Sequence, residues 1–168
     1  MDKNELKEKI LLLLQTYSTR EAQIALLKFE LGNMTMATPE DMLQAMAYSR
    51  GTPEHRPSAG NISDKTYRVA VTYQDQAERQ NRDQYAEVAL ELERLERKQY
   101  RLRYCVSQLP SEQASVVTGM YFEHQDQRSL GDKLHLSEST IKRYRNRALD
   151  TLAEMYLTLL DAGAVLDW

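Results

Sequence analysis

The chain of 168 residues has one cysteine, two Phe and one Trp, against ten Tyr. A single cysteine excludes an internal disulfide, so we expect a reducing compartment. Its longest early apolar run, residues 10–14, is too short for the hydrophobic region of a signal peptide. No stretch approaches the about 20 apolar residues of a membrane span. These absences predict a cytoplasmic protein with no membrane partner.

Features of catalytic and metal sites are also scarce. The chain has no P-loop and no glycine-rich phosphate cradle. Its histidines, His55, His124 and His135, are scattered, and none stands at a metal-ligand spacing from Cys105. The sequence therefore predicts no catalytic residues, no metal, no cofactor and no small-molecule substrate. It favours a protein that is not an enzyme.

An overall excess of positive charge is absent, since the net charge is −3. The distribution is uneven, however. Six basic residues between positions 128 and 147 face two acidic ones, a local net charge of +4. A basic patch on an otherwise acidic chain is typical of an oriented contact with DNA.

Glycine and proline divide the chain into segments and predict an all-α fold. Apolar spacing in residues 1–31 predicts two helices with a break near Tyr17, capped by Ser18 or Thr19. Thr38 and Pro39 open a third, short helix ending near Ser49. The expected segments are an N-terminal helical region (1–49), a linker rich in Gly and Pro (50–61), a long central helix (62–109) and a DNA-binding domain (110–162).

The long central helix has no Gly or Pro between residues 61 and 109. Its apolar positions alternate in steps of four and three, with Gln99 at one of them, which is a heptad pattern. Two interpretations stay open: a solvated rod packing on the N-terminal helices, or a dimerising coiled coil. The residues of the predicted dimer seam are Val88, Leu92, Leu95, Leu102 and Val106.

The segment after Pro110 has the layout of a helix-turn-helix. We expect Ser129 to cap the first helix and Gly131 to lie where the two helices cross closely. Leu136 would fill the turn, and Ser137 would cap the second helix and offer free amides to a phosphate. A second helix of this kind fits the major groove of DNA.

Phasing the second helix, residues 138–149, at about 100° per residue places Ile141 and Ala148 on its buried side. The residues expected to contact base edges lie opposite: Ser139, Lys142, Arg143 and Asn146. Contacts to phosphates would supply affinity and register. The residues predicted for them are Arg128, Lys133, Ser137, Thr140, Arg145 and Arg147.

Three stretches resemble region 4 of bacterial sigma-70-type factors: LPSEQ at 109–113, MYFE at 120–123 and LHLSESTIKRYRNRAL at 134–149. The layout is similar to the ArpU and RinA groups of phage late-gene transcriptional regulators. The resemblance implies that residues 137–147 form the recognition element. Ser129 stands where the family usually has an acidic residue, and Gly131 where it usually has Ala.

The resemblance implies a transcriptional regulator that activates phage or prophage genes in a bacterial host. A complete sigma factor is not expected, since no region 2 is recognisable. Its expected partners are double-stranded DNA, a second copy of the chain and RNA polymerase. Two alternatives remain. One is a phage small terminase subunit, which packages DNA. The other is a protein that binds RNA polymerase or another host factor and no DNA.

Overall fold

The computed structural model describes residues 2–38, 40–41, 63–166 and 168. Within these ranges every regular element is a helix, so the all-α prediction is confirmed. The chain forms two compact units, one of Met1–Leu26 with Leu92–Trp168, the other of Leu27–Glu91. Each helix in the described ranges is too short or too polar to cross a bilayer.

Two N-terminal helices, α1 (Lys3–Gln15) and α2 (Tyr17–Asn33), confirm the predicted break near Tyr17. The predicted caps were wrong, because Ser18 and Thr19 lie inside α2. The interruption is Thr16, whose Oγ1 donates to the Leu12 carbonyl and accepts from the Arg20 guanidinium. A side chain that competes for backbone hydrogen bonds thus marks the break.

Arg20 is buried, and it fixes the junction of α1 and α2 to the long helix α4 (Ser63–Ser107). Its Nη2 donates to the Leu13 carbonyl at 2.6 Å and its Nε to Gln99 Oε1 at 2.9 Å. Desolvation lowers the pKa of Arg20. The polar position in the apolar pattern of α4 is therefore explained, since Gln99 is the buried acceptor for this guanidinium.

The main core of the first unit joins α1, the end of α4, α5 (Ser111–Val117) and α7 (Glu138–Asp161). Leu102 and Val106, predicted for a dimer seam, are buried in this core at 0% and 3% exposure. Both residues pack inside their own chain. A heptad pattern alone does not distinguish a helix contact within one chain from a dimer contact. Cys105 is buried beside them, and burial raises its pKa. Val88, Leu92 and Leu95 are half-buried.

Few interactions are described in the second unit. Asn81 on α4 receives the Ala37 backbone N–H at 2.9 Å and donates to its carbonyl at 3.0 Å. Thr38 Oγ1 accepts the Asp41 N–H, which confirms the predicted cap. The rest of the predicted third helix and the linker 50–61 lie outside the described residues, so the segment boundaries stay predictions.

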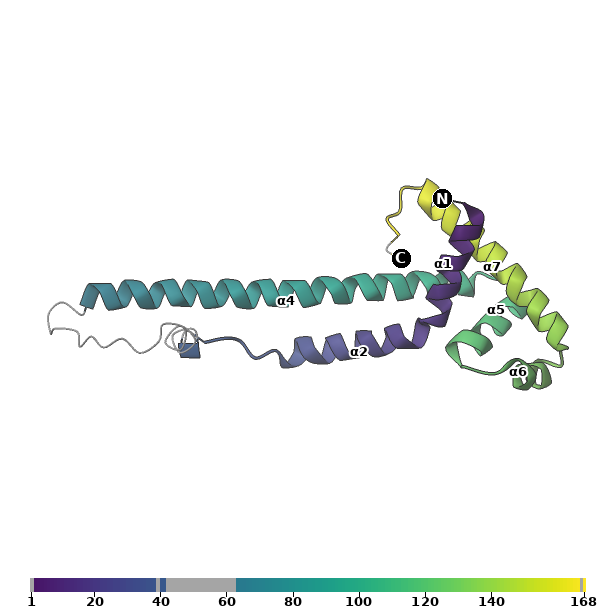
Figure 1. Ribbon diagram of the computed structural model, residues 1–168, viewed down its shortest axis with the longest axis horizontal. Helices are drawn as coiled ribbons and strands as arrows, with labels where there is room; N and C mark the ends of the chain where they lie inside the picture. The colour runs from purple at the N-terminus through teal and green to yellow at the C-terminus, as the bar shows by residue number, and fades with distance from the viewer. Residues whose placement is uncertain (1, 39, 42–62, 167) are drawn as a thin grey trace. The chain divides into compact units, whose positions relative to one another are not determined.

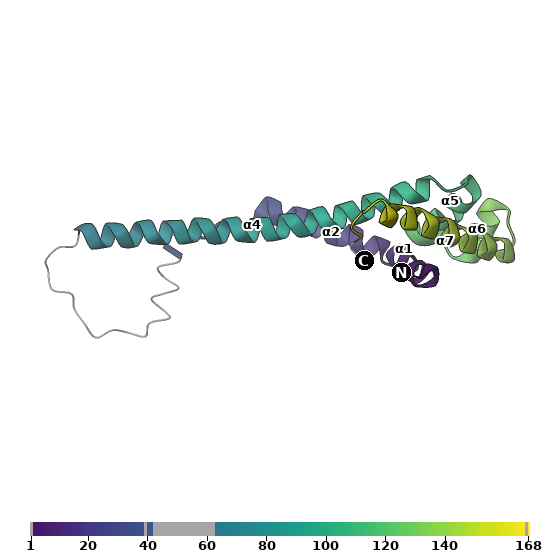
Figure 2. The ribbon, with the colours of Figure 1, turned by 90° about the horizontal axis from the view of Figure 1, so that it is seen from above.

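The C-terminal helices follow α4 in the order α5, the π-helix η1 (Thr118–Phe122), α6 (Gln127–Leu134) and α7. Helix α7 contacts α1, α5 and α6. Figure 1 shows the course of α7 past α1 and α5, and Figure 2 shows these two helices on different sides of α7. The second helix of the predicted motif is therefore the start of a 24-residue helix that continues through the core.

Candidate nucleic-acid interface

Helix α6 begins earlier than predicted, and its cap is Asp126 rather than Ser129. The Asp126 carboxylate accepts the backbone N–H groups of Arg128 and Ser129, each at 2.9 Å, and the Ser129 hydroxyl. The hydrogen bonds from Ser129 lower the pKa of Asp126. The Ser129 cap prediction was wrong because aspartate placed at the true N-cap position takes up both free amides.

The turn between α6 and α7 depends on two backbone features. His135 ends α6 in the left-handed conformation, with φ of 55°. The Leu136 N–H then donates to the Gly131 carbonyl at 2.9 Å. A Cβ on Gly131 would lie 2.8 Å from the Leu136 carbonyl oxygen, so the predicted need for a small residue at this crossing is confirmed.

Ser137 caps α7, as predicted. It has an extended backbone, and its Oγ accepts the Thr140 N–H at 3.3 Å. The same hydroxyl lies 3.0 Å from Ser139 Oγ and 2.8 Å from Thr140 Oγ1. Three hydroxyl groups thus gather at the helix N-terminus, where the helix dipole favours an anion.

A small second core orients the motif. Val116, Leu130 and Ile141 are at most 1% exposed, and Leu136 and Tyr144 pack against them. Because Ile141 faces this core and Ala148 faces the main core, one side of α7 is fixed over two turns. The predicted phase of the helix is confirmed.

The four residues predicted to contact bases are all exposed on α7: Ser139, Lys142, Arg143 and Asn146. The Arg143 guanidinium lies 5.8 Å from the centre of the Tyr144 ring, a cation–π contact. Arg145 donates to Asn146 Oδ1 at 3.2 Å. This bond uses one of the two lone pairs of Oδ1, the atom with which Asn146 would accept the amino group of an adenine.

The residues predicted to contact phosphates fall into two groups. Arg128, Lys133, Ser137 and Arg147 are exposed, whereas Thr140 and Arg145 are half-buried. Lys133 forms an ion pair with Glu123 at 3.1 Å. Its charge is therefore partly neutralised, and we expect it to contribute less to phosphate binding than Arg128.

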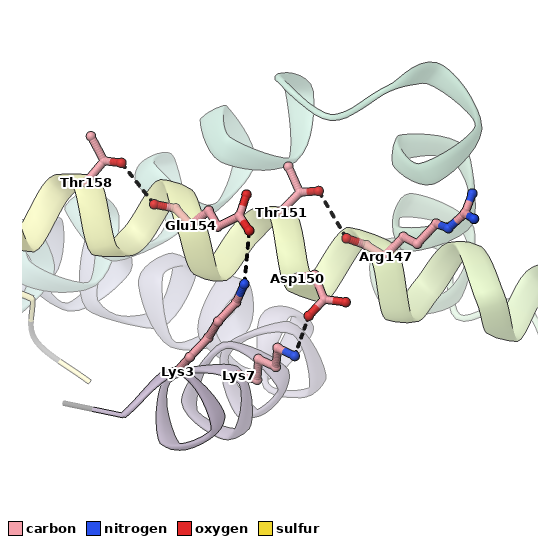
Figure 3. A network of polar contacts seen from close by, with 7 residues as sticks. All are labelled: Lys3, Lys7, Arg147, Asp150, Thr151, Glu154 and Thr158. Carbon is pink, nitrogen blue, oxygen red and sulfur yellow. Dashed lines mark hydrogen bonds and ion pairs between the residues drawn. The ribbon is translucent and has the colours of Figure 1, made fainter.

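Sequence patterns missed the contribution of α1. Lys3 pairs with Glu154 at 2.9 Å, and Lys7 pairs with Asp150 (Figure 3). Both acids lie on α7 directly after its basic segment. No local pattern could have revealed these pairs, since the partners stand at opposite ends of the sequence.

The π-helix η1 contacts both the N-terminal helices and α6. Phe122, its last residue, stacks on Tyr17 with the ring centres 3.9 Å apart. Gly119 within η1 lies against Leu130, since an added Cβ would be 2.5 Å from a Leu130 methyl group. The start of α2 and helix α6 are therefore both packed against this short segment.

Comparison with known families agrees with this geometry. Residues 99–152 match the model described as Sigma-70, region 4. No curated protein and no solved structure matches the chain. The match begins at the end of α4, includes α5 and α6, and ends within α7. Residues 99–152 thus match a sigma-70 region 4 domain of the helix-turn-helix type.

Proposed function

We propose that this protein is a sequence-specific DNA-binding regulator that activates phage or prophage genes by docking the first half of α7 in the major groove. One observation carries the proposal. The exposed residues Ser139, Lys142, Arg143 and Asn146 occupy the side of α7 opposite the fully buried Ile141 and Ala148. A rigid helix with polar groups along its free side is what a groove about 12 Å wide accepts.

Each polar group has a chemical partner in the groove. Arg143 and Lys142 suit the O6 and N7 acceptors of guanine, and Asn146 suits the donor and acceptor of adenine. The hydroxyls around Ser137 and the guanidiniums of Arg128 and Arg147 suit phosphate oxygens. Phosphate contacts set the position of the helix, and base contacts supply the choice of sequence.

Assembly as a dimer completes the proposal. Part of the predicted seam lies outside the main core and is half-buried: Val88, Leu92 and Leu95. A symmetric dimer would contact two half-sites about 34–36 Å apart, or a multiple of that distance. RNA polymerase is the proposed partner in activation.

Selection of bound duplexes from a random-sequence pool tests the proposal. The wild-type protein should enrich one motif, and the Lys142→Ala/Arg143→Ala double variant should lose it. A Lys28→Ala variant, changed on α2 far along the chain from the motif, serves as the charge control. Failure of the wild type to enrich any motif would overturn the proposal.

Mass measurement in solution tests the proposed assembly. We expect twice the chain mass for the wild type and the single mass for a Leu92→Asp variant. A ring of many copies would instead fit a DNA-packaging subunit, and a wild-type monomer would contradict the dimer.

A further inference from the structure

We propose that Lys7 on α1 is a positioning residue for DNA binding, because it holds Asp150 away from Arg147 and so keeps the Arg147 guanidinium available to a phosphate. The inference rests on the proposed function. It assigns a role in DNA contact to the N-terminal helix, which lies outside the matched residues 99–152.

The sequence of α7 places an acidic residue, Asp150, within reach of Arg147. Asp150 stands three residues after Arg147 and four after Asn146. Side chains at these spacings share one face of a helix and attract each other when their charges are opposite. An unengaged Asp150 would therefore compete with phosphate for Arg147. It would also place a negative charge beside the approaching DNA.

The observed contacts remove that competition. The Lys7 ammonium pairs with the Asp150 carboxylate, so the acid is turned toward α1 (Figure 3). The Arg147 side chain extends away from Asp150 in the same view. Arg147 is exposed, and in the described part of the chain its guanidinium forms no ion pair. The Arg147 backbone carbonyl accepts the Thr151 hydroxyl at 3.1 Å.

A second ion pair provides the matched control. Lys3 and Glu154 also join α1 to α7, one helical turn farther from Arg147. Both pairs are solvent-exposed, with side-chain exposures of 43% and 66% for Lys3–Glu154 and of 33% and 47% for Lys7–Asp150. Exposed pairs contribute little to stability. An effect of Lys7 on DNA binding that Lys3 lacks would therefore arise from its pairing with Asp150, the acid three residues after Arg147.

The experiment is a titration of a duplex carrying the selected motif, at several salt concentrations, with thermal unfolding measured in parallel. Loss of one phosphate contact reduces the steepness of log binding constant against log salt concentration by about 0.9. At 0.15 M salt this corresponds to about fivefold lower affinity. We expect the full change for Arg147→Ala and a smaller change in the same direction for Lys7→Ala. Lys7→Arg and Lys7→Ala/Asp150→Asn should bind like the wild type, as should Lys3→Ala.

The outcomes distinguish a failure of the proposed function from a failure of the Lys7 inference. A wild-type protein that binds no duplex overturns the proposed function. If the wild type binds, the inference is overturned by a Lys7→Ala variant with unchanged affinity and slope. An equal loss in Lys3→Ala, or a failure of Asp150→Asn to restore binding, would show a general role of α1 in folding and would also overturn it.

Discussion

The backbone of Gly131 lies against the carbonyl of Leu136, so closely that a methyl group at position 131 would stand 2.8 Å from the oxygen. The same two residues are joined by the hydrogen bond from the Leu136 N–H to the Gly131 carbonyl. This contact sets the distance between α6 and the turn. It also explains why the chain accepts glycine inside a helix, where glycine costs about 1 kcal/mol relative to alanine.

Replacing Gly131 with Ala should destabilise the protein. The gain in helix propensity is about 1 kcal/mol, whereas overpacking against a backbone atom costs about 1–3 kcal/mol, so we expect a net loss of about 1 kcal/mol. Chemical denaturation measures it. Gly32→Ala is the control, because a Cβ there meets no atom within 4 Å. A Gly131→Ala protein more stable than the wild type would refute the close approach.

Ser137 should show separable roles in stability and DNA binding. Ser137→Ala removes the acceptor for the Thr140 N–H and should cost about 1 kcal/mol of stability. Ser137→Asp keeps the cap and should keep stability, but its negative charge should weaken DNA binding. Unfolding and duplex titration of both variants test this. Unchanged binding by Ser137→Asp would remove Ser137 from the phosphate contacts.

Asp126 should make stability depend on pH at the acidic end. Its pKa is lowered by hydrogen bonds from Ser129, so its contribution is present above the unfolded pKa of about 3.9 and is lost as pH falls through the lower folded value. The free energy of unfolding should therefore fall less steeply below about pH 4 in Asp126→Asn than in the wild type. An equal dependence of the free energy of unfolding on pH in both proteins would show that the pKa of Asp126 does not change on folding.

Leu102 should behave as a core residue of its own chain. Leu102→Ala removes a side chain with 0% exposure and should cost about 2–5 kcal/mol, at any protein concentration. Leu90→Ala, at a position on the same helix with 68% exposure, should change stability by less than about 0.5 kcal/mol. A loss in Leu102→Ala that depends on protein concentration would instead support the dimer seam at this position.

Local chemistry made much of the site predictable. The phase of α7, its Ser137 cap and the small residue at Gly131 each follow from short-range rules of helix periodicity, capping and close approach. The start of α6 did not, because the polar stretch from Glu123 to Ser129 offers two residues of a preferred capping type, Asp126 and Ser129. Asp126 is the cap because α6 begins at Gln127, and that start is set by where the π-helix η1 and the turn after it end.

Long-range partners were beyond the reach of sequence patterns. The heptad pattern of α4 identified an apolar face but not its partner, and Leu102 and Val106 pack on α1 and α7 residues of their own core. Gln99 interrupts that apolar face because its side chain accepts a hydrogen bond from Arg20, a residue far away in the sequence. The pairing of Lys7 with Asp150 is of the same kind.

The most direct test of the central claim is a titration of the selected duplex and of a scrambled duplex with the wild-type protein and with Arg143→Ala. We expect the wild type to prefer the selected duplex by at least about 1000-fold, and Arg143→Ala to lose about 1–3 kcal/mol of that preference while binding the scrambled duplex almost as before. Equal affinity of the wild type for both duplexes, or a preference that Arg143→Ala leaves intact, would contradict the account.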